Sequence, residues 1–235
     1  MLNCNSVGTR NEIEREAWVR QRLESIPAGS RLLDAGAGEQ RFKKFCGHLH
    51  YVSQDFGQYD GTGDHAGLQT ATWNQANLDI VSDITAIPEP NGSFDAILCT
   101  EVLEHLPNPI AAVAEFSRLL RGDGQLILTA PFCSLTHFSP FHYFTGFNRY
   151  FYEVHLPQHG FRITEIVSNG NFFEYLAQEI RRVGSVAEKY VGIGPGILER
   201  LASKVYLGLL ARLAQGDRGS AELLNFGYFV RAVKG

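Results

Sequence analysis

The chain has 235 residues, a net charge of −4 and 44% hydrophobic residues, as expected for a globular protein with one well-buried core. This charge gives no basic footprint for nucleic acid, and no run approaches the roughly 20 apolar residues that span a bilayer. Residues 1–22 carry too many charges for a secretory signal, and the four scattered cysteines are typical of reduced thiols. We therefore expect a cytoplasmic protein without a transmembrane segment or a nucleic-acid partner.

The first half of the chain alternates helical and strand patterns. Residues 11–26 have the spacing of an amphipathic helix that ends at Pro27-Ala28-Gly29. Apolar runs predict strands at residues 31–34, 51–56, 94–99 and 126–129, and an alternation of apolar and polar residues predicts another at 78–83. A short helix is expected at 39–48. Asn108-Pro109 begins another helix, with asparagine as N-cap and proline at the first helical position. This alternation predicts a doubly wound α/β sheet.

The second half is less regular. Residues 57–77 form a long loop, which inside a compact domain is usually functional or poorly ordered. Residues 132–152 are too rich in Phe and Tyr for an ordinary exposed loop. Further elements are expected as strands at 161–167 and 225–233 and as helices at 171–190 and 196–214. The last helix carries an apolar side that predicts core or a dimer surface, with contact to a membrane surface as the less favoured alternative. That side consists of Ile197, Leu201, Val205, Leu209 and Leu213.

Candidate ligand-binding residues follow successive predicted strands, where open parallel sheets bind their ligands. They are the turn Asp34-Ala35-Gly36-Ala37-Gly38, then Asp55-Phe56, then Asp83-Ile84, and finally the segment from Thr100 to Leu106 that contains Glu101, Glu104 and His105. Glycines let the backbone turn sharply and let a ligand approach without meeting a Cβ atom. An acidic residue such as Asp55 can accept hydrogen bonds from both hydroxyls of a ribose. Each motif alone also has a structural explanation, as a turn, a solvated cap or a helix anchor.

In this order and spacing, the motifs of residues 28–133 resemble those of the class I S-adenosylmethionine (SAM)-dependent methyltransferases. The resemblance implies a Rossmann-like fold, a doubly wound, mostly parallel seven-stranded sheet with helices on both faces. It also implies SAM as cofactor and S-adenosyl-L-homocysteine as product. The glycine turn would lie under the methionine part and the ribose, and Asp83-Ile84 would meet the adenine. The implied cofactor-binding residues are Asp34, Gly36, Ala37, Gly38, Asp55, Phe56, Asp83, Ile84, Thr100, Glu101 and His105.

The resemblance further implies one methyltransferase domain over residues 1–235. Within it, residues 1–27 would form an N-terminal helix and residues 28–133 the SAM-binding core. Residues 134–235 would supply an acceptor-side lid, additional helices and the last two strands. The methyl group would pass by in-line displacement to a small-molecule or glycan-like acceptor. Neither the acceptor nor the oligomeric state follows from the sequence.

Candidates for a general base lie just after the fifth predicted strand. They are His137, His142 and Tyr143, and the alternative is that these side chains only pack a lid. His155 and His159 have helical i,i+4 spacing, but Pro157 between them disfavours a regular helix, so we expect no metal site. Two other functions remain open, a SAM-binding protein without turnover and an NAD-dependent oxidoreductase. The second is disfavoured because Arg41 stands where a dinucleotide motif has its third glycine.

Overall fold

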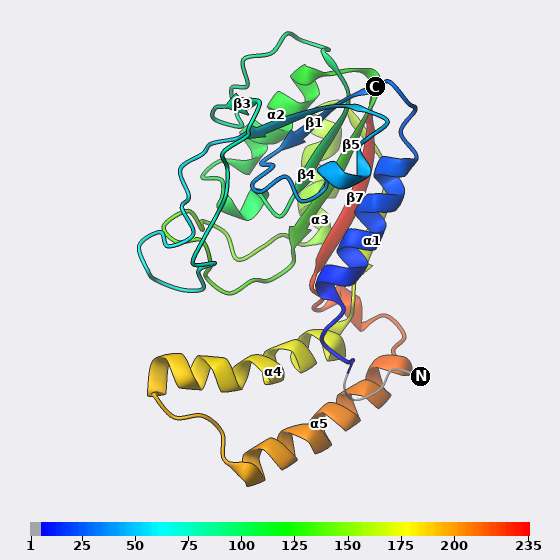
Figure 1. Ribbon diagram of the computed structural model, residues 1–235. Coiled ribbons are helices and arrows are strands. Elements are labelled where there is room, and N and C mark those ends of the chain that lie inside the picture. The colour runs from blue at the N-terminus through cyan, green and yellow to red at the C-terminus, as the bar shows by residue number, and fades with distance from the viewer. Residues whose placement is uncertain (1–5) are drawn as a thin grey trace. The chain divides into compact units, whose positions relative to one another are not determined.

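The computed structural model describes residues 6–235 (Figure 1). In chain order its elements are α1 (Asn11–Glu24), β1 (Arg31–Ala35), η1 (Lys43–Phe45), β2 (His50–Asp55), β3 (Ile80–Val81), β4 (Phe94–Thr100), η2 (Leu103–His105), α2 (Pro109–Leu119), β5 (Leu120–Pro131), α3 (Arg149–Gln158), β6 (Phe161–Asn169), α4 (Phe172–Val191), α5 (Ile197–Gln215), η3 (Ser220–Glu222) and β7 (Gly227–Lys234). The labels η1 to η3 denote single 3₁₀ turns. In the part of the chain described, no helix is long and apolar enough to cross a membrane.

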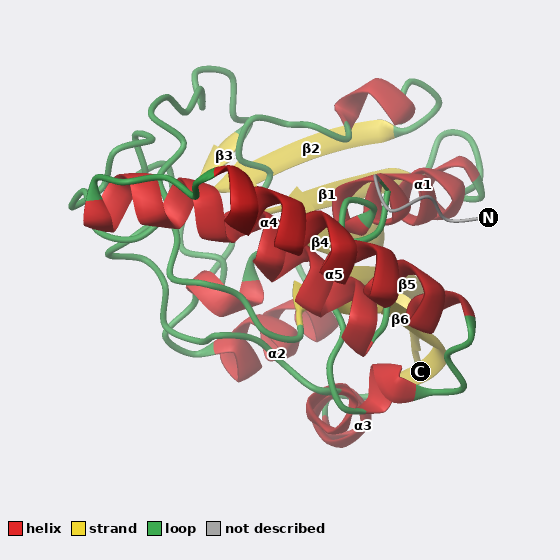
Figure 2. Ribbon diagram, turned by 90° about the horizontal axis from the view of Figure 1, so that it is seen from below, coloured by secondary structure: helices red, strands yellow, loops and turns green. Residues whose placement is uncertain are grey.

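The strands form a seven-stranded sheet in the order β3-β2-β1-β4-β5-β7-β6. The pairs from β3 to β5 are parallel, whereas β7 runs antiparallel to β5. Figure 2, with strands in yellow, shows β2, β1, β4 and β5 side by side. The strand order reverses at the neighbours β1 and β4, and ligands of such sheets bind beside this point. The predicted mostly parallel, doubly wound sheet is confirmed.

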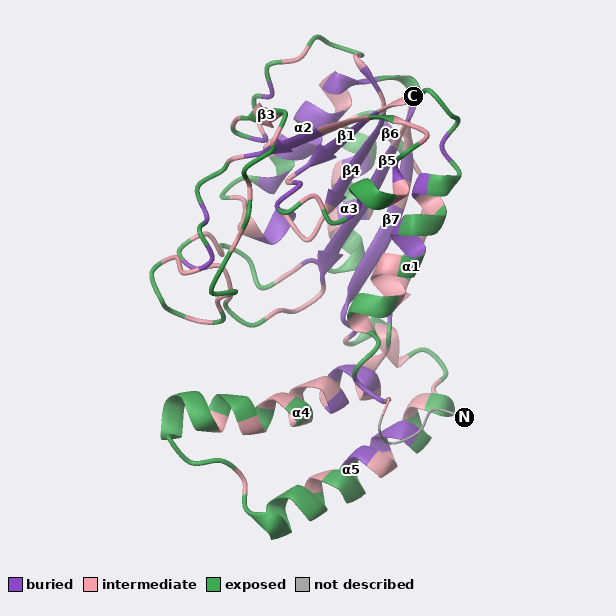
Figure 3. Ribbon diagram, viewed as in Figure 1, coloured by how far each residue is buried: buried purple, intermediate pink, exposed green. Residues whose placement is uncertain are grey.

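Successive residues of the central strands face opposite sides of the sheet, and each side has its own core. Leu33 and Ile97 pack with residues of α2 and α3, while Leu32 and Ala96 pack with Trp18 and other residues of α1. Helices therefore cover both faces, as expected. Burial on both sides explains why these strands read as continuous apolar runs. Figure 3 shows β1, β4, β5 and β7 in the purple of buried residues.

Two local predictions are wrong. The helix expected over 39–48 is reduced to turns and the short η1, and the strand expected over 78–83 is reduced to β3. Beside β3, the carboxylate of Asp79 accepts hydrogen bonds from the backbone N–H and the hydroxyl of Ser53. A side chain that bonds to a neighbouring backbone in this way replaces a ladder contact.

The chain divides into two compact units. The sheet unit comprises Glu16–Val167 and Gly227–Gly235, and the helical unit comprises the described residues up to Arg15 together with Ser168–Phe226. The helical unit contains the α4–α5 hairpin and has a separate small core of Val7, Ala177, Leu207, Leu210 and Ala211. The single domain over residues 1–235, with its divisions after residues 27 and 133, stays a prediction.

Candidate active site

The glycine loop follows β1. The backbone N–H groups of Gly36 and Ala37 both donate to the carbonyl of Gln54, each at 2.8 Å. Gly36 has φ +76° and Gly38 has φ +50°, in the left-handed region that favours glycine. A Cβ on Gly36 would lie 2.4 Å from Cγ2 of Val102, and one on Gly38 would lie 2.6 Å from Cζ2 of Trp73. Val102 and Trp73 therefore leave no room for a side chain at these two positions, even when no ligand is bound.

Asp55 closes the end of β2 against this loop. Its carboxylate is buried and accepts hydrogen bonds from the N–H of Gly38 at 2.9 Å and of Gly57 at 3.1 Å. The side-chain amide of Gln75 donates to Oδ1 at 2.8 Å. Two backbone donors fix the carboxylate, while the third donor belongs to a flexible side chain of the long loop. A ribose hydroxyl could replace that third donor without disturbing the fold.

Asp34 lies deeper than expected for a ligand contact. It is only 2% exposed, and its Oδ2 accepts a 2.6 Å hydrogen bond from the hydroxyl of Tyr51. Burial raises the pKa of Asp34 to about 7; the hydrogen bond from Tyr51 opposes this shift and the charge of Asp55 adds to it. Asp34 therefore supports the floor of the loop, and its direct contact with a cofactor stays a prediction.

The residues expected around adenine have different surroundings. Asp83 is exposed, and its Oδ1 accepts hydrogen bonds from both the N–H and the hydroxyl of Thr85, each at 2.8 Å. Ile84 is buried in the core of the sheet unit. Phe56 is half-buried and meets the ring of Phe141 edge-on at 4.9 Å. Their contacts with adenine stay predictions.

Glu101 begins the segment after β4 with φ +53°, which is unusual for a residue other than glycine. Its N–H donates to the carbonyl of Thr129, and its carboxylate accepts from the Thr129 hydroxyl at 2.8 Å. Thr100 is the last residue of β4. The two bonds to β5 hold a strained backbone conformation, and such conformations cluster at functional sites.

Glu104 and His105 follow on the η2 turn. Glu104 is 1% exposed, and its carbonyl accepts the N–H groups of Tyr143 and Phe144. Nδ1 of His105 lies 2.6 Å from the carbonyl of Phe141. Because a carbonyl only accepts, Nδ1 carries the proton and Nε2 carries the lone pair. Within the described residues, Nε2 makes no hydrogen bond, and it lies 3.7 Å from Oε1 of Glu104. Burial and the nearby charge of His137 lower the pKa of His105 to about 3, so this imidazole is neutral.

His137 and His142 gather against His105, with ring centroids 4.6 and 5.8 Å from it. Nδ1 of His137 donates to the carbonyl of Leu135 at 2.8 Å. The hydroxyl of Ser134 donates to the carbonyl of Thr145, so it accepts from Nε2 of His142, 3.2 Å away. The lone pair of His142 therefore lies on Nδ1. Burial and the charge of His137 lower the pKa of His142, which keeps it neutral near pH 7.

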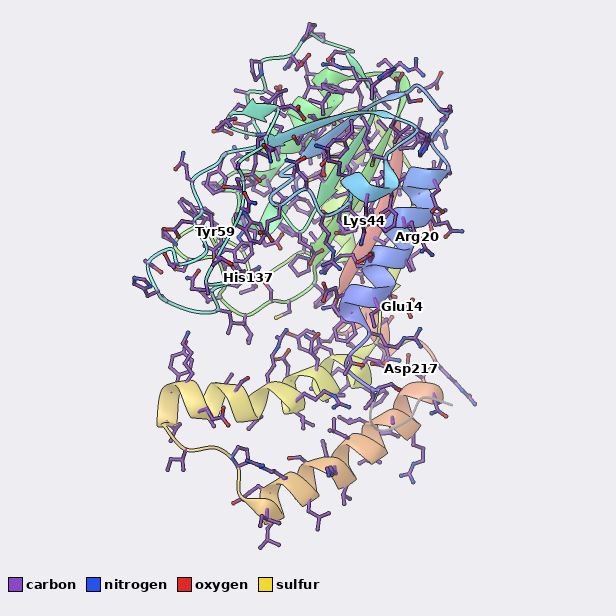
Figure 4. The ribbon with its side chains drawn as sticks, in the orientation of Figure 1. Glu14, Arg20, Lys44, Tyr59, His137 and Asp217 are labelled. Atoms are coloured by element: carbon purple, nitrogen blue, oxygen red, sulfur yellow. The ribbon has the colours of Figure 1, made fainter. Side chains whose placement is uncertain are left out.

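The long loop of residues 57–77 joins this cluster. Leu68 donates its N–H to the carbonyl of Thr136 and accepts from the N–H of Phe138. Phe138 stacks on Tyr59 at 4.5 Å and meets Trp73 edge-on at 5.0 Å. Figure 4 places Tyr59 and His137 close together, on the loops that follow β2 and β5. The two irregular segments thus form one aromatic wall beside the glycine loop.

The side chain of Tyr143 and the pair His155/His159 make no ring contact with this cluster in the residues described. Tyr143 is 49% exposed. Helix α3 includes Pro157 in its last turn and ends at Gln158, so His155 is helical whereas His159 is the C-cap. Nδ1 of His159 donates to the carbonyl of His155 at 2.8 Å, so His159 caps this helix.

A different set, Glu104, His105 and His137, has potential metal-ligand atoms within 4.8 Å of one another. The sequence indicated no metal site here because its three residues come from two separate segments. Gln75, Tyr51 and Trp73 were also missed as site residues, although the amide-rich loop that carries Gln75 and Trp73 was itself a signal.

The fold and the glycine loop are those expected of a class I methyltransferase domain, and the comparisons with known proteins agree over part of the chain. Residues 33–128 match the family model described as "Methyltransferase domain". The resemblance to SAM-dependent methyltransferases is therefore confirmed for this segment.

The sequence is similar to the ubiquinone biosynthesis O-methyltransferase of Xanthomonas oryzae pv. oryzae, with 32% identity over 115 residues, 48% of this chain and 46% of the relative. The matched region spans about half the length of the curated relatives. Among solved structures, a SAM-dependent methyltransferase from Archaeoglobus fulgidus superposes with TM-score 0.57 at 14% identity, covering 94% of both chains. The [4+2]-cyclase SpnF superposes with TM-score 0.55 at 16% identity, covering 94% of this chain and 80% of the cyclase. At such identities the structures show a shared fold alone.

Proposed function

We propose that this protein is a SAM-dependent methyltransferase that acts on a hydroxyl group of a small-molecule or glycan-like acceptor. The observation that carries the proposal is the junction where the glycine loop after β1 contacts the end of β2 and the segment after β4. There Asp55 binds the N–H of Gly38, and Val102, which follows β4, packs against Gly36. The segment that matches the methyltransferase domain contains all four of these residues.

The residues at this junction fit the cofactor. Asp55 offers a fixed carboxylate to the ribose, with the Gln75 amide as the exchangeable donor. Asp34 supports the loop from below, while Asp83 and Ile84, which follow β3, would contact the adenine. When bound, SAM supplies an already activated methyl group with a neutral leaving group. The chain then has to align the acceptor with the methyl group, and alignment contributes on the order of 7–11 kcal/mol in well-oriented reactions.

The histidine cluster supplies the acceptor side. We assign Nδ1 of His142 as the atom that receives the acceptor proton, because its Nε2 is held by Ser134. The lowered pKa leaves this nitrogen unprotonated near neutral pH. A general base of this kind adds roughly 10²–10⁴-fold to a rate. His137 and Tyr143 are the other candidates, while the half-buried, neutral His105 orients the loop through Phe141.

The proposed class of acceptor rests on the aromatic wall beside the glycine loop and on the name of one relative. Tyr59, Trp73 and Phe138 present aromatic rings with few charges, which suits an aromatic or sugar ring better than a polyanion. The name of the Xanthomonas relative specifies transfer to oxygen. A cytoplasmic location belongs to this proposal as well.

Two measurements test the proposal. Titration calorimetry with S-adenosylhomocysteine and, separately, with NAD should give binding of the first only; the reverse result would identify an oxidoreductase. Methyl-tritiated SAM should then label a phenol or an oligosaccharide from an acceptor panel. Tight binding of S-adenosylhomocysteine with no labelling across the panel would favour a SAM-binding protein without turnover, or a cyclase like the structural neighbour.

A further inference from the structure

The α4–α5 hairpin ends in a stretch without any charged side chain. We call residues 190–198, Tyr-Val-Gly-Ile-Gly-Pro-Gly-Ile-Leu, the hairpin tip. Its large side chains are strongly exposed, from 64% for Tyr190 and 69% for Ile193 to 88% for Ile197. Isolated exposed apolar residues are ordinary, but a contiguous group indicates an interaction surface.

The two helices of the hairpin pack on each other over only part of their length. The small core of the helical unit uses residues near the start of α4 and the end of α5, such as Ala177 and Leu210. No residue between 181 and 206 is buried. The apolar side predicted for the last helix is among the exposed residues, since Leu201 is 58% and Val205 70% exposed. The prediction that this side forms core is therefore wrong; Leu207, Leu210 and Ala211 are buried instead.

The distribution of these residues favours a bilayer over a protein partner. Exposed apolar side chains occur on the end of α4, in the link and on the start of α5, so they surround the tip. A protein groove covers one face of a helix, whereas the boundary between lipid headgroups and acyl chains accepts an apolar tip from all sides. Tyr190 and Tyr206, 64% and 50% exposed, are amphipathic residues of the kind enriched at such boundaries.

The charges of the hairpin agree with this partner. Residues 172–215 contain more basic than acidic residues, although the whole chain has a net charge of −4. The basic residues are Arg181, Arg182, Lys189, Arg200, Lys204 and Arg212, and the acidic ones are Glu174, Glu179, Glu188 and Glu199. Lys189, Arg200 and Lys204 flank the apolar tip, where they can contact anionic headgroups.

We propose that the hairpin tip docks on the surface of an anionic lipid bilayer, with residues 190–198 inserted at the headgroup boundary. The proposal concerns binding alone and does not depend on methyl transfer. Since the helices are not apolar enough to span, the docking is peripheral and reversible.

The test is co-sedimentation of the full chain with vesicles of phosphatidylcholine, with and without phosphatidylglycerol. We expect binding to the anionic vesicles, weakened by added salt. The double variant Ile197→Glu/Leu198→Glu should reduce it by at least about tenfold, because a charge is costly at the headgroup boundary. Lys204→Glu should weaken binding to anionic vesicles more than binding to neutral ones. The matched control is Leu223→Glu, which changes a residue 67% exposed in the same unit but outside the hairpin and should leave binding unchanged.

Three results would overturn the proposal. The first is no sedimentation of the wild-type chain with anionic vesicles. The second is equal binding by wild type and the double variant, with both shown to be folded by circular dichroism. The third is a concentration-dependent dimer in light scattering that the double variant abolishes while vesicles bind neither protein, because the tip would then be an interface between two copies of this chain.

Discussion

The N–H of Gly38 donates to Oδ2 of Asp55 at 2.9 Å and thereby ties the loop after β1 to the end of β2. The same carboxylate binds Gly57 and Gln75. One buried side chain thus holds the glycine loop, the end of β2 and the long loop in one geometry.

Replacing this carboxylate should weaken cofactor binding. We expect Asp55→Ala to lower the affinity for S-adenosylhomocysteine about tenfold to a hundredfold, since charge-assisted hydrogen bonds contribute about 1.5–3 kcal/mol. Asp55→Asn, which keeps the shape but loses the charge, should fall between Ala and wild type. Titration calorimetry measures both, and an unchanged affinity of Asp55→Ala would remove Asp55 from the cofactor site.

The glycine loop should be intolerant of a side chain for an internal reason. Gly36→Ala places a Cβ 2.4 Å from Val102 and strains a residue at φ +76°, so we expect a clear loss of stability in urea unfolding. The double variant Gly36→Ala/Val102→Ala should recover part of it, because the clash is relieved and only the backbone strain of about 1 kcal/mol stays. Gly47→Ala is the control, as nothing lies within 4 Å of its added Cβ. A Gly36→Ala variant as stable as Gly47→Ala would contradict this account.

Asp34 should make stability depend on pH. Its pKa is about 7 in the folded chain against 3.8 ordinarily, so the folded state binds the extra proton between these values. The stabilisation that this proton gives to the folded state is therefore fully present below about pH 4 and is lost as the pH rises through about 7. Over this window the free energy of unfolding falls by about 1.4 kcal/mol for each pH unit. We expect Asp34→Asn to remove this component from urea unfolding free energies measured across that window. A pH dependence identical to that of the wild type would show that Asp34 does not hold the proton.

His142 should affect turnover more than cofactor binding. We expect His142→Ala to lower kcat by roughly 10²-fold or more, as for loss of a general base, with little change in affinity for S-adenosylhomocysteine. In the wild type the acid limb of kcat should lie below the ordinary histidine pKa of 6.5. His137→Ala should move that limb upward, because it removes the charge that depresses the pKa of His142. His159→Ala, which alters only a helix cap, is the control. Full activity of His142→Ala would assign the base elsewhere.

The reaction should proceed without a divalent metal ion. The methyl group of SAM is already activated, and the proposed base His142 lies outside the set of Glu104, His105 and His137. We therefore expect chelator treatment followed by desalting to leave methyl transfer unchanged. Loss of activity that a divalent cation restores would instead assign Glu104, His105 and His137 as metal ligands.

The parallel strands and the glycine loop were predictable from local sequence. The strands of residues 31–34 and 94–99 are buried on both faces and so read as apolar runs, and Asn108 is the N-cap of α2, as the Asn-Pro pattern predicts. The glycine loop was recognisable because few residues tolerate its backbone angles. Short-range rules suffice where one residue decides the local conformation.

The contacts of the loops after β2 and β5 and of the α4–α5 hairpin were not predictable in the same way. The contact between Leu68 and Phe138 joins two loops 70 residues apart, and neither loop has a periodic pattern that would reveal its partner. On α5, apolar residues occur on more than one side, and the packing of Ala177 and Val7 decides that Leu210 is buried. Tertiary contacts determine which side of α5 is buried, and helical periodicity alone cannot show it.

The connection between β6 and β7 leaves the sheet and returns to it at one place. The N–H of Phe226 donates to the carbonyl of Asn169, and the N–H of Gly235 donates to that of Gly160, so these neighbouring strands run antiparallel. The chain between Asn169 and Phe226 therefore departs and returns at adjacent backbone positions. A short turn could close the same gap without shifting the register of either strand. The register of β6 and β7 is therefore independent of the length of the segment between them.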